Sequence, residues 1–202
     1  MVSNLTTLAT LEMKTGTLSV AMRGDDLVFA VPGSIYLSSS DLQPRAALQG
    51  DFTPRSLSVD ELGRMHLFVG VDTRLELWVL TPDGSRTATR PLNPEYGAPI
   101  APPAIGYDHA IHVVTADAIV ALTADGQPLW ERRPAGRIAG AGVSTDGRVL
   151  LTAGRELQAY DEKGEREVLF RSAEGSLVTP PVMSAAGEIF VATADTLVCL
   201  GR

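Results

Sequence analysis

The sequence has little cysteine, no surplus of positive charge and no long apolar run, and each absence excludes a class of protein. Cys199 is the one cysteine among 202 residues, which excludes an intramolecular disulfide and a cysteine-based zinc cluster. Seventeen basic residues against twenty-four acidic ones leave a net charge of −7, which argues against a nucleic-acid partner. No run approaches the roughly 18 apolar residues of a membrane-spanning helix, and residues 1–20 do not read as a signal peptide.

The remaining composition is that of a chain with a substantial core, because 45% of the residues are apolar and 20% are charged. Helical periodicity is scarce, and nineteen glycines and thirteen prolines interrupt the chain too often for long helices. Short alternating runs occur instead, for example at 27–31, 111–115 and 189–193, each followed by a turn and a second apolar run. This pattern predicts an all-β fold.

The apolar runs repeat about every 40 residues and can be aligned in columns. The first column begins the second strand of each copy and contains Leu27, Met65, Ile111, Val149 and Ile189. A column six residues earlier contains Ala21, Val59, Ile105, Val143 and Met183. A column in the third strand contains Ile35, Leu77, Ile119, Leu157 and Leu197. Every member is apolar, so we expect all three columns to lie in the core.

A repeat of about 40 residues with four strands is typical of a β-propeller blade. We therefore predict one domain over residues 1–202, an all-β five-bladed β-propeller of four-stranded antiparallel blades. The predicted blades are residues 15–50, 54–92, 100–135, 138–173 and 178–202. The last copy ends after its third strand, and an orphan alternating segment, Thr7–Met13, precedes the first copy. We expect residues 5–14 to supply the missing strand and close the ring. The alternative is an open arc of a longer propeller.

One segment of the third copy carries a family resemblance. Residues 121–130, Ala-Leu-Thr-Ala-Asp-Gly-Gln-Pro-Leu-Trp, resemble the tryptophan-docking motif of pyrroloquinoline-quinone-type (PQQ-like) repeat propellers. The resemblance implies that Ala121 ends the third strand, Gly126 turns the hairpin and Trp130 packs against the next blade, with Phe170 in the corresponding role one copy later. Quinone-dependent members carry an adjacent-cysteine pair that this chain lacks, so the resemblance implies the quinone-free branch, an assembly scaffold with no cofactor.

Candidate binding residues lie on the predicted loop face. The basic run 131–137, with two further arginines, predicts a patch for an acidic partner or anionic ligand, although a solvated outer strand has the same appearance. The longest connection, 91–100, carries a tyrosine that we expect to be an exposed contact residue, unless the loop simply plugs the channel. The predicted partner-binding residues are Arg55, Tyr96, Arg133, Arg137 and Arg155.

Other motifs carry no predicted chemistry, and we expect no catalytic residue, metal or cofactor. His66 and His112 share a column and are expected in the core, since packed sheets lie about 10 Å apart, too far to share one metal ion. The glycine-rich run 136–142 lacks the P-loop and dinucleotide spacings, so we expect its glycines to permit close approach of an inner strand. Asp60 and Asp108 form no facing carboxylate pair.

These observations favour a non-catalytic scaffold that binds a protein or peptide on the loop face, with no nucleic acid and no membrane span. A lectin-like or small-molecule-binding propeller is the alternative, because the turns Thr115–Asp117 and Thr193–Asp195 repeat. A hydrolase or lyase with its site in the central channel ranks third. The starting methionine without an export signal predicts the cytoplasm, or export if the sequence has been trimmed. The sequence predicts neither the partner nor the oligomeric state.

Overall fold

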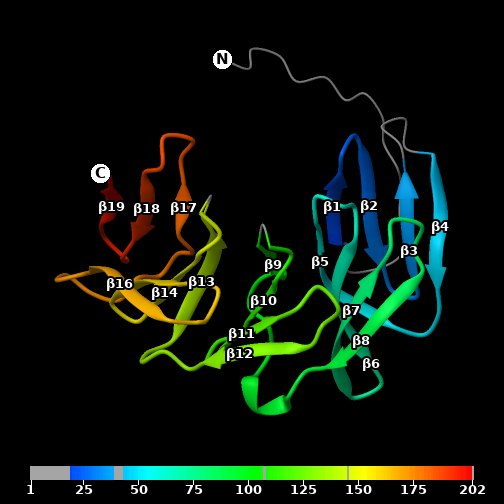
Figure 1. The fold of residues 1–202 in the computed structure, drawn as a ribbon, viewed down its shortest axis with the longest axis horizontal. Helices are drawn as coiled ribbons and strands as arrows, with labels where there is room; N and C mark the ends of the chain where they lie inside the picture. The colour runs from blue at the N-terminus through cyan, green and yellow to red at the C-terminus, as the bar shows by residue number, and fades with distance from the viewer. Residues whose placement is uncertain (1–18, 39–42, 107, 145, 202) are drawn as a thin grey trace.

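A computed structural model describes residues 19–38, 43–106, 108–144 and 146–201 as five antiparallel sheets set side by side in an arc (Figure 1). The first sheet contains β1 (Ser19–Arg23), β2 (Asp26–Val31), β3 (Ser34–Ser38) and β4 (Pro44–Gln49). The second contains β5 (Thr53–Val59), β6 (Met65–Val71), β7 (Arg74–Leu80) and β8 (Arg86–Pro91). Each sheet is a meander, in which consecutive strands are neighbours.

The third and fourth sheets repeat this plan, and the fifth has three strands within the described residues. The third contains β9 (Ala104–Ile105), β10 (Ile111–Val114), β11 (Ile119–Leu122) and β12 (Pro128–Arg132). The fourth contains β13 (Ile138–Val143), β14 (Val149–Ala153), β15 (Glu156–Tyr160) and β16 (Arg166–Arg171). The fifth contains β17 (Val182–Met183), β18 (Ile189–Ala192) and β19 (Leu197–Leu200).

The prediction of an all-β fold with four-stranded antiparallel units is confirmed. The segment 5–14 that we expect to close the ring lies outside the described residues, and the first and fifth sheets stand at opposite ends of the arc in Figure 1. Closure and the number of blades therefore stay predictions. Within the described ranges, no helix has both the length and the apolar character needed to cross a bilayer.

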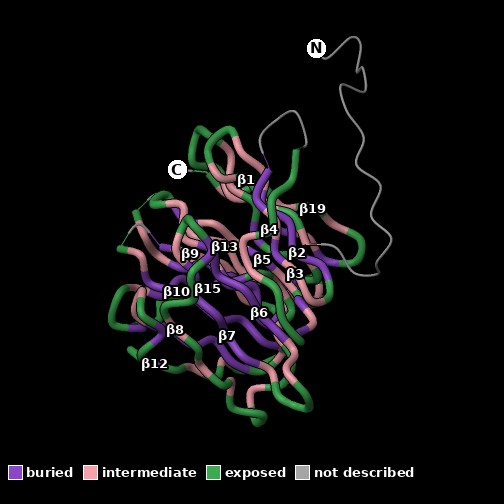
Figure 2. Tube along the Cα trace, turned by 90° about the vertical axis from the view of Figure 1, so that its right-hand side faces the viewer, coloured by how far each residue is buried: buried purple, intermediate pink, exposed green. Residues whose placement is uncertain are grey.

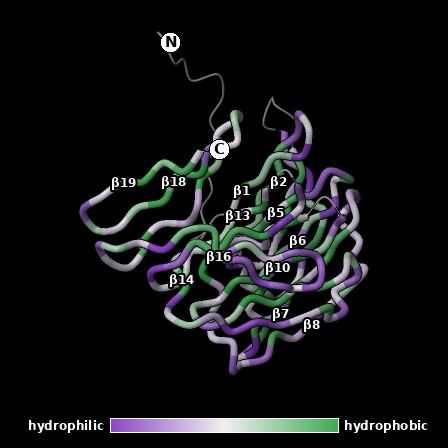
Figure 3. The backbone as a smooth tube through the Cα atoms, turned by 60° about the vertical axis from the view of Figure 1, so that its left-hand side comes forward, coloured by the Kyte–Doolittle hydropathy of each residue, from purple (hydrophilic) through white to green (hydrophobic). Residues whose placement is uncertain are grey.

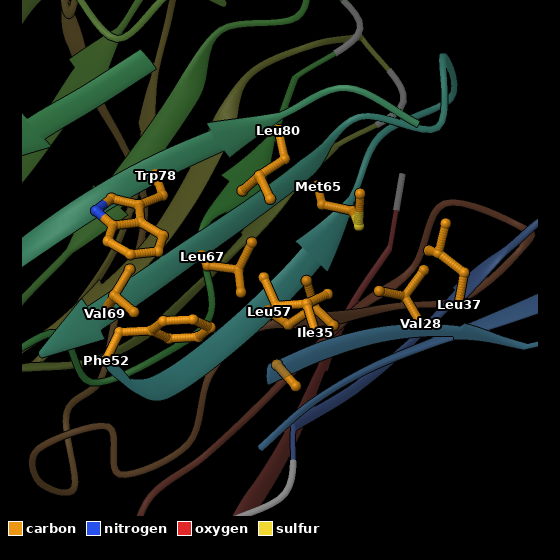
Figure 4. Packing of buried hydrophobic residues seen from close by; sticks show 11 residues of the cluster. Val28, Ile35, Leu37, Phe52, Leu57, Met65, Leu67, Val69, Trp78 and Leu80 are labelled. Atoms are coloured by element: carbon orange, nitrogen blue, oxygen red, sulfur yellow. The ribbon is translucent and has the colours of Figure 1, made fainter. Parts of the chain in front are cut away.

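The core consists of layers between consecutive sheets. We call the side of a sheet that meets the next sheet its forward face, and the opposite side its backward face. Between the first two sheets, Val28 and Ile35 on the forward face pack with Leu67 and Trp78 on the backward face of the second (Figure 4). Full burial of each such side chain contributes about 1.5–3 kcal/mol. Figure 2 shows the resulting buried positions along β2, β6, β7 and β10, with exposed residues at the turns.

The third-strand column shows where this layering stops. Its first four members, on the forward faces of the first four sheets, are 0% exposed: Ile35, Leu77, Ile119 and Leu157. The fifth, Leu197, is 72% exposed. Its neighbours on the forward face of the fifth sheet are Phe190, Ala192 and Cys199, of which the first two are half-buried and Cys199 is exposed. Figure 3 shows the hydrophobic character of β18 and β19 at this end of the arc.

The predicted column that begins with Ala21 is shifted by one residue in the first copy. Met22, rather than Ala21, lies opposite Leu27 in the β1–β2 pair. The β1–β2 turn has two residues, 24 and 25, whereas the corresponding turns of the other copies have five, as at 60–64. The shorter turn shifts the register by one residue, and a shift of one residue moves a side chain to the other face. Met22 therefore lies on the backward face of the first sheet, where it is 60% exposed.

Trp130 packs against the next sheet, as the resemblance implies. Its Nε1 donates to the carbonyl oxygen of Glu162 at 3.1 Å, and its ring stacks on Tyr160 with centroids 5.9 Å apart. The ring also covers Gly164, which turns the β15–β16 hairpin with a φ of +72°. An outer-strand alanine approaches the turn glycine of the following sheet as closely in the first copy, because a Cβ at Gly84 would lie 2.6 Å from the Cβ of Ala47, whereas a Cβ at Gly126 would lie 3.8 Å from the Cβ of Arg90.

Replacement of Gly164 by alanine is expected to destabilise the fold by about 2–4 kcal/mol, from positive-φ strain and overpacking together. A Cβ at this position would lie 2.7 Å from the Trp130 ring. Gly187→Ala is the matched control, because Gly187 has a φ of +84° and no atom within 4 Å of its added Cβ. Chemical denaturation measures both variants. Equal losses of unfolding free energy would show that Trp130 does not dock on Gly164.

Candidate functional site

A groove of about 600 Å³ lies among β1, β5 and the β8–β9 connection, residues 92–103. We call the first strand of each sheet, such as β1 and β5, its inner strand. One wall is formed by residues 98–102, and the floor includes side chains of β5, β6 and β7. Most of these side chains are apolar, such as Leu57, Phe68 and Leu75. The polar residues of the lining are Ser19 of β1 and, at consecutive positions of β5, Arg55 and Ser56.

Arg55 is presented to the groove by an irregularity in β5. Pro54 pairs with Val69 and Ser56 with Phe68, so Arg55 is the extra residue of a β-bulge. A bulge turns a side chain away from the regular alternation of the strand. The Arg55 side chain lies beside Gly70, where an added Cβ would be at an ordinary contact distance of 3.8 Å from the Arg55 Nε. No described carboxylate lies within 4 Å of the guanidinium, so its positive charge is unneutralised among the described residues.

The adjacent Ser56 carries a buried hydroxyl whose Oγ has no hydrogen-bond partner in the part of the chain that the structure describes. A buried polar group without a partner costs about 1–3 kcal/mol. Such groups are few in native structures and each has a reason, of which one is an absent ligand or water. The floor of the groove therefore offers one full positive charge and one uncommitted hydroxyl side by side.

The wall of the groove is held in place by backbone contacts. The Ile100 N–H donates to the carbonyl oxygen of Val114 at 3.0 Å, and Pro99 forms a β-bridge with Thr115. The Ser58 hydroxyl donates to the carbonyl oxygen of Pro103 at 2.7 Å. These contacts fix the end of a long connection that would otherwise be free to vary. They leave the Ile100 side chain 41% exposed.

Tyr96 and Arg133, two of the predicted partner-binding residues, lie together. Tyr96 ends the 3-10 helix η1 (Pro94–Tyr96), and its hydroxyl donates to a Glu131 carboxylate oxygen at 2.7 Å. This hydrogen bond raises the pKa of the Tyr96 phenol and lowers the pKa of Glu131. The Arg133 Nε donates to the same carboxylate at 3.0 Å, and its guanidinium lies 5.6 Å from the Tyr96 ring centroid. The contacts among Tyr96, Glu131 and Arg133 anchor the β8–β9 connection to β12.

The other three predicted residues are separate from this pair. Arg55 lies in the groove. The Arg155 Nε donates to the carbonyl oxygen of Ser172 at 3.0 Å, and its Nη2 donates to that of Ala173, so Arg155 fastens the β16–β17 connection. Arg137 lies exposed just before β13. Among the described residues, no hydrogen bond or ion pair joins these three arginines into one patch with Tyr96 and Arg133.

The repeated threonine turns use their hydroxyls internally. The Thr115 Oγ1 accepts from the N–H of Ala118 at 3.0 Å, and the Thr193 Oγ1 accepts from that of Thr196 at 3.0 Å. This is the usual way in which a threonine stabilises a turn. The glycine-rich run behaves as expected, because a Cβ at Gly140 would lie 2.6 Å from the Cβ of Pro180.

Asp60 and the histidines form a second polar region, in the turns that lead to β6 and β10. Asp60 accepts from the backbone N–H groups of Leu62 and Arg64, from the Arg64 Nε at 2.7 Å, and lies 3.2 Å from the His66 Nε2. Burial raises the pKa of Asp60, but the hydrogen bonds from Arg64 outweigh it and hold the pKa below its ordinary value. This carboxylate is occupied by partners within its own turn.

His66 and His112 are both buried, as expected, and burial lowers the pKa of each. His112 lies against Trp130, with ring centroids 5.8 Å apart. Across the described ranges, no group of three or more histidine, cysteine, aspartate or glutamate side chains is arranged to hold a metal ion.

Comparison with solved structures gives the class of fold. A streptogramin B lyase superposes with a TM-score of 0.66 at 17% identity, over 90% of this chain and 67% of that chain. A catalytically inactive virginiamycin B lyase from Staphylococcus aureus with quinupristin gives 0.70 at 13% identity, over 94% and 71%. BBS1N in complex with ARL6DN gives 0.67 at 16% identity, over 96% and 68%.

These neighbours are β-propeller proteins, so the chain has a propeller-type all-β fold and spans about two thirds of their length. No family model matches the sequence. No curated protein matches it either. The PQQ-like resemblance therefore stays a prediction, and identities this low show the fold alone.

Acid is expected to destabilise the fold through His112. Its pKa is below the ordinary value of 6.5 when folded, so the unfolded chain takes up a proton first as the pH falls. The free energy of unfolding should therefore fall from pH 7 to pH 5, by up to about 1.4 kcal/mol per pH unit for this group. His112→Gln should reduce the slope, measured by denaturation at each pH. An unchanged slope would mean that His112 is charged in the folded protein.

Proposed function

We propose that the protein is a non-catalytic scaffold whose groove beside the β8–β9 connection binds a protein or peptide partner. The combination of an apolar wall with the unneutralised Arg55 and the unpartnered Ser56 hydroxyl supports this proposal. Binding sites commonly join an apolar surface to a few polar groups that fix orientation. The BBS1N neighbour was solved in complex with ARL6DN.

The alternatives have less support. A lyase is among the neighbours, but a channel site would need uncommitted acid–base groups, and the Asp60 carboxylate is already held by Arg64 and its own turn. A lectin-like site in the repeated turns would use the hydroxyls of Thr115 and Thr193, which already accept hydrogen bonds from backbone N–H groups. The quinone-free branch of the PQQ-like repeats agrees with a scaffold role.

The finer architecture that we propose is the five-bladed ring, closed by residues 5–14 as the fourth strand of the fifth sheet. Support comes from two exposed apolar faces. The forward face of the fifth sheet exposes Leu197 and Cys199, and the backward face of the first sheet exposes Val20 and Met22. Each face has the chemistry that packs between every other pair of sheets, and contact between them would bury both.

Closure predicts that Cys199 and a cysteine at position 22 approach each other within one chain. Because Cys199 is the one cysteine of the sequence, Met22→Cys creates a single pair. A short bifunctional maleimide should link the two in the monomer, detected as a peptide crosslink by mass spectrometry. Leu62→Cys, in the exposed β5–β6 turn, is the matched control and should give no link. A crosslink only between chains, or none, would contradict closure.

Partner docking predicts a position-dependent photocrosslink. A benzoylphenylalanine at Ile100 should give an adduct of one defined mass in the cells that make the protein, because this side chain lies exposed on the groove wall. The same group at Leu129, exposed on the outer strand β12, is the control. Arg55→Ala should reduce the Ile100 adduct at least severalfold. The same adducts at both positions, unaffected by Arg55→Ala, would contradict the proposed site.

A further inference from the structure

The groove combines three features that define the chemistry of its occupant. Arg55 supplies a positive charge that no described carboxylate neutralises. The Ser56 Oγ supplies a buried hydroxyl without a partner next to it. The exposed apolar side chain of Ile100, from the connection, lies in the lining of the same groove.

We infer that the groove binds an extended segment of a partner protein in which an acidic side chain, aspartate or glutamate, lies between apolar residues. This inference rests on the proposed function and specifies the partner. The carboxylate would accept from the Arg55 guanidinium and from the Ser56 hydroxyl, which would give the Ser56 Oγ a hydrogen-bond partner. The flanking apolar residues would pack against Ile100 and the other apolar side chains of the wall.

Charge complementarity selects a carboxylate over a neutral or basic group. An arginine guanidinium matches the planar carboxylate with two parallel hydrogen bonds. The bulge holds the backbone of Arg55 outside the regular ladder, and the Arg55 side chain lies beside Gly70. The net charge of −7 opposes the approach of an acidic segment to the protein as a whole, so binding of such a segment depends on a local positive charge like that of Arg55.

The backbone of the groove wall favours a side-chain carboxylate of the partner over the partner's C-terminal carboxylate. Capture of a C-terminal carboxylate uses several convergent backbone N–H groups. The wall is poor in them: Pro99 and Pro102 have none, and the Ile100 N–H is already bonded to Val114. An internal acidic residue needs only the two donors that the floor supplies.

Selection from a random nonapeptide library displayed on phage tests the inference. Fusion through the peptide C-terminus removes the free terminal carboxylate from every member. Three immobilised proteins are compared: the unsubstituted chain, Arg55→Gln, and Arg45→Gln as a control for loss of an exposed arginine outside the groove, on β4. We expect the unsubstituted chain and Arg45→Gln to enrich peptides with one aspartate or glutamate between apolar residues, and Arg55→Gln to lose the acidic preference.

The best peptide is then synthesised with both ends blocked, and its affinity is measured by fluorescence anisotropy. Arg55→Gln should weaken binding about tenfold or more, as should replacement of the acidic residue of the peptide by its amide, and Ser56→Ala should weaken it less. Thermal unfolding of each variant confirms that it is folded.

Two results would overturn the inference in distinguishable ways. Enriched peptides that lose affinity for an Ile100→Ser variant but lack an acidic residue, or bind Arg55→Gln equally well, would leave docking in the groove intact and reject the carboxylate. No enrichment above the bare support would reject the groove as a docking site and the inference with it.

Discussion

The packing of each sheet against the next is the constraint on which the rest of the structure depends. An antiparallel sheet of this length has two apolar faces, and a single meander of four short strands cannot bury both of them. The chain solves this by placing the forward face of each sheet against the backward face of the following one. Ile35, Leu77, Ile119 and Leu157 lose all their exposure in this way. The exposure of Leu197 marks the one forward face that no described sheet covers.

The outer and inner edges of the sheets follow from the same packing. At the outer edge, Trp130 lies on the turn glycine of the next sheet, and Ala47 closely approaches Gly84 in the first copy, so outer-strand residues of different size meet a turn glycine. At the inner edge, Gly140 lets β13 approach the segment that precedes β17. The groove exists because the connection from the second to the third sheet is long and is fixed along the inner strand β5 by Ser58.

The sequence predicts those parts of the fold that follow from a repeating pattern of residues. Alternation of apolar residues predicts strands, and the 40-residue repeat predicts that equivalent positions share an environment, as the column from Ile35 to Leu157 does. The role of Trp130 follows from the resemblance to a docking motif. The shift from Ala21 to Met22 was missed because it depends on the length of one turn.

The candidate site is harder to predict from the sequence, because it depends on contacts that no repeating residue pattern indicates. Arg55 was identified as a basic residue, but nothing in the sequence marks the bulge that presents it or the unpaired hydroxyl of Ser56. The bond between Tyr96 and Glu131 joins residues that are 35 positions apart and in different copies. Arg155, one of the predicted partner-binding residues, donates to the backbone of its own chain, and the sequence does not show this contact because it depends on where the β16–β17 connection passes.

A double-mutant cycle between Trp130 and Tyr160 measures the sheet-to-sheet packing directly. The two rings belong to the third and fourth sheets and stack with centroids 5.9 Å apart. Each is replaced by leucine, alone and together, and the free energy of unfolding is measured for all four proteins. Face-to-face packing predicts a coupling of about 0.5–1.5 kcal/mol, the range found for aromatic pairs in contact. Additive losses, with no coupling, would contradict the packing of consecutive sheets as the basis of the fold.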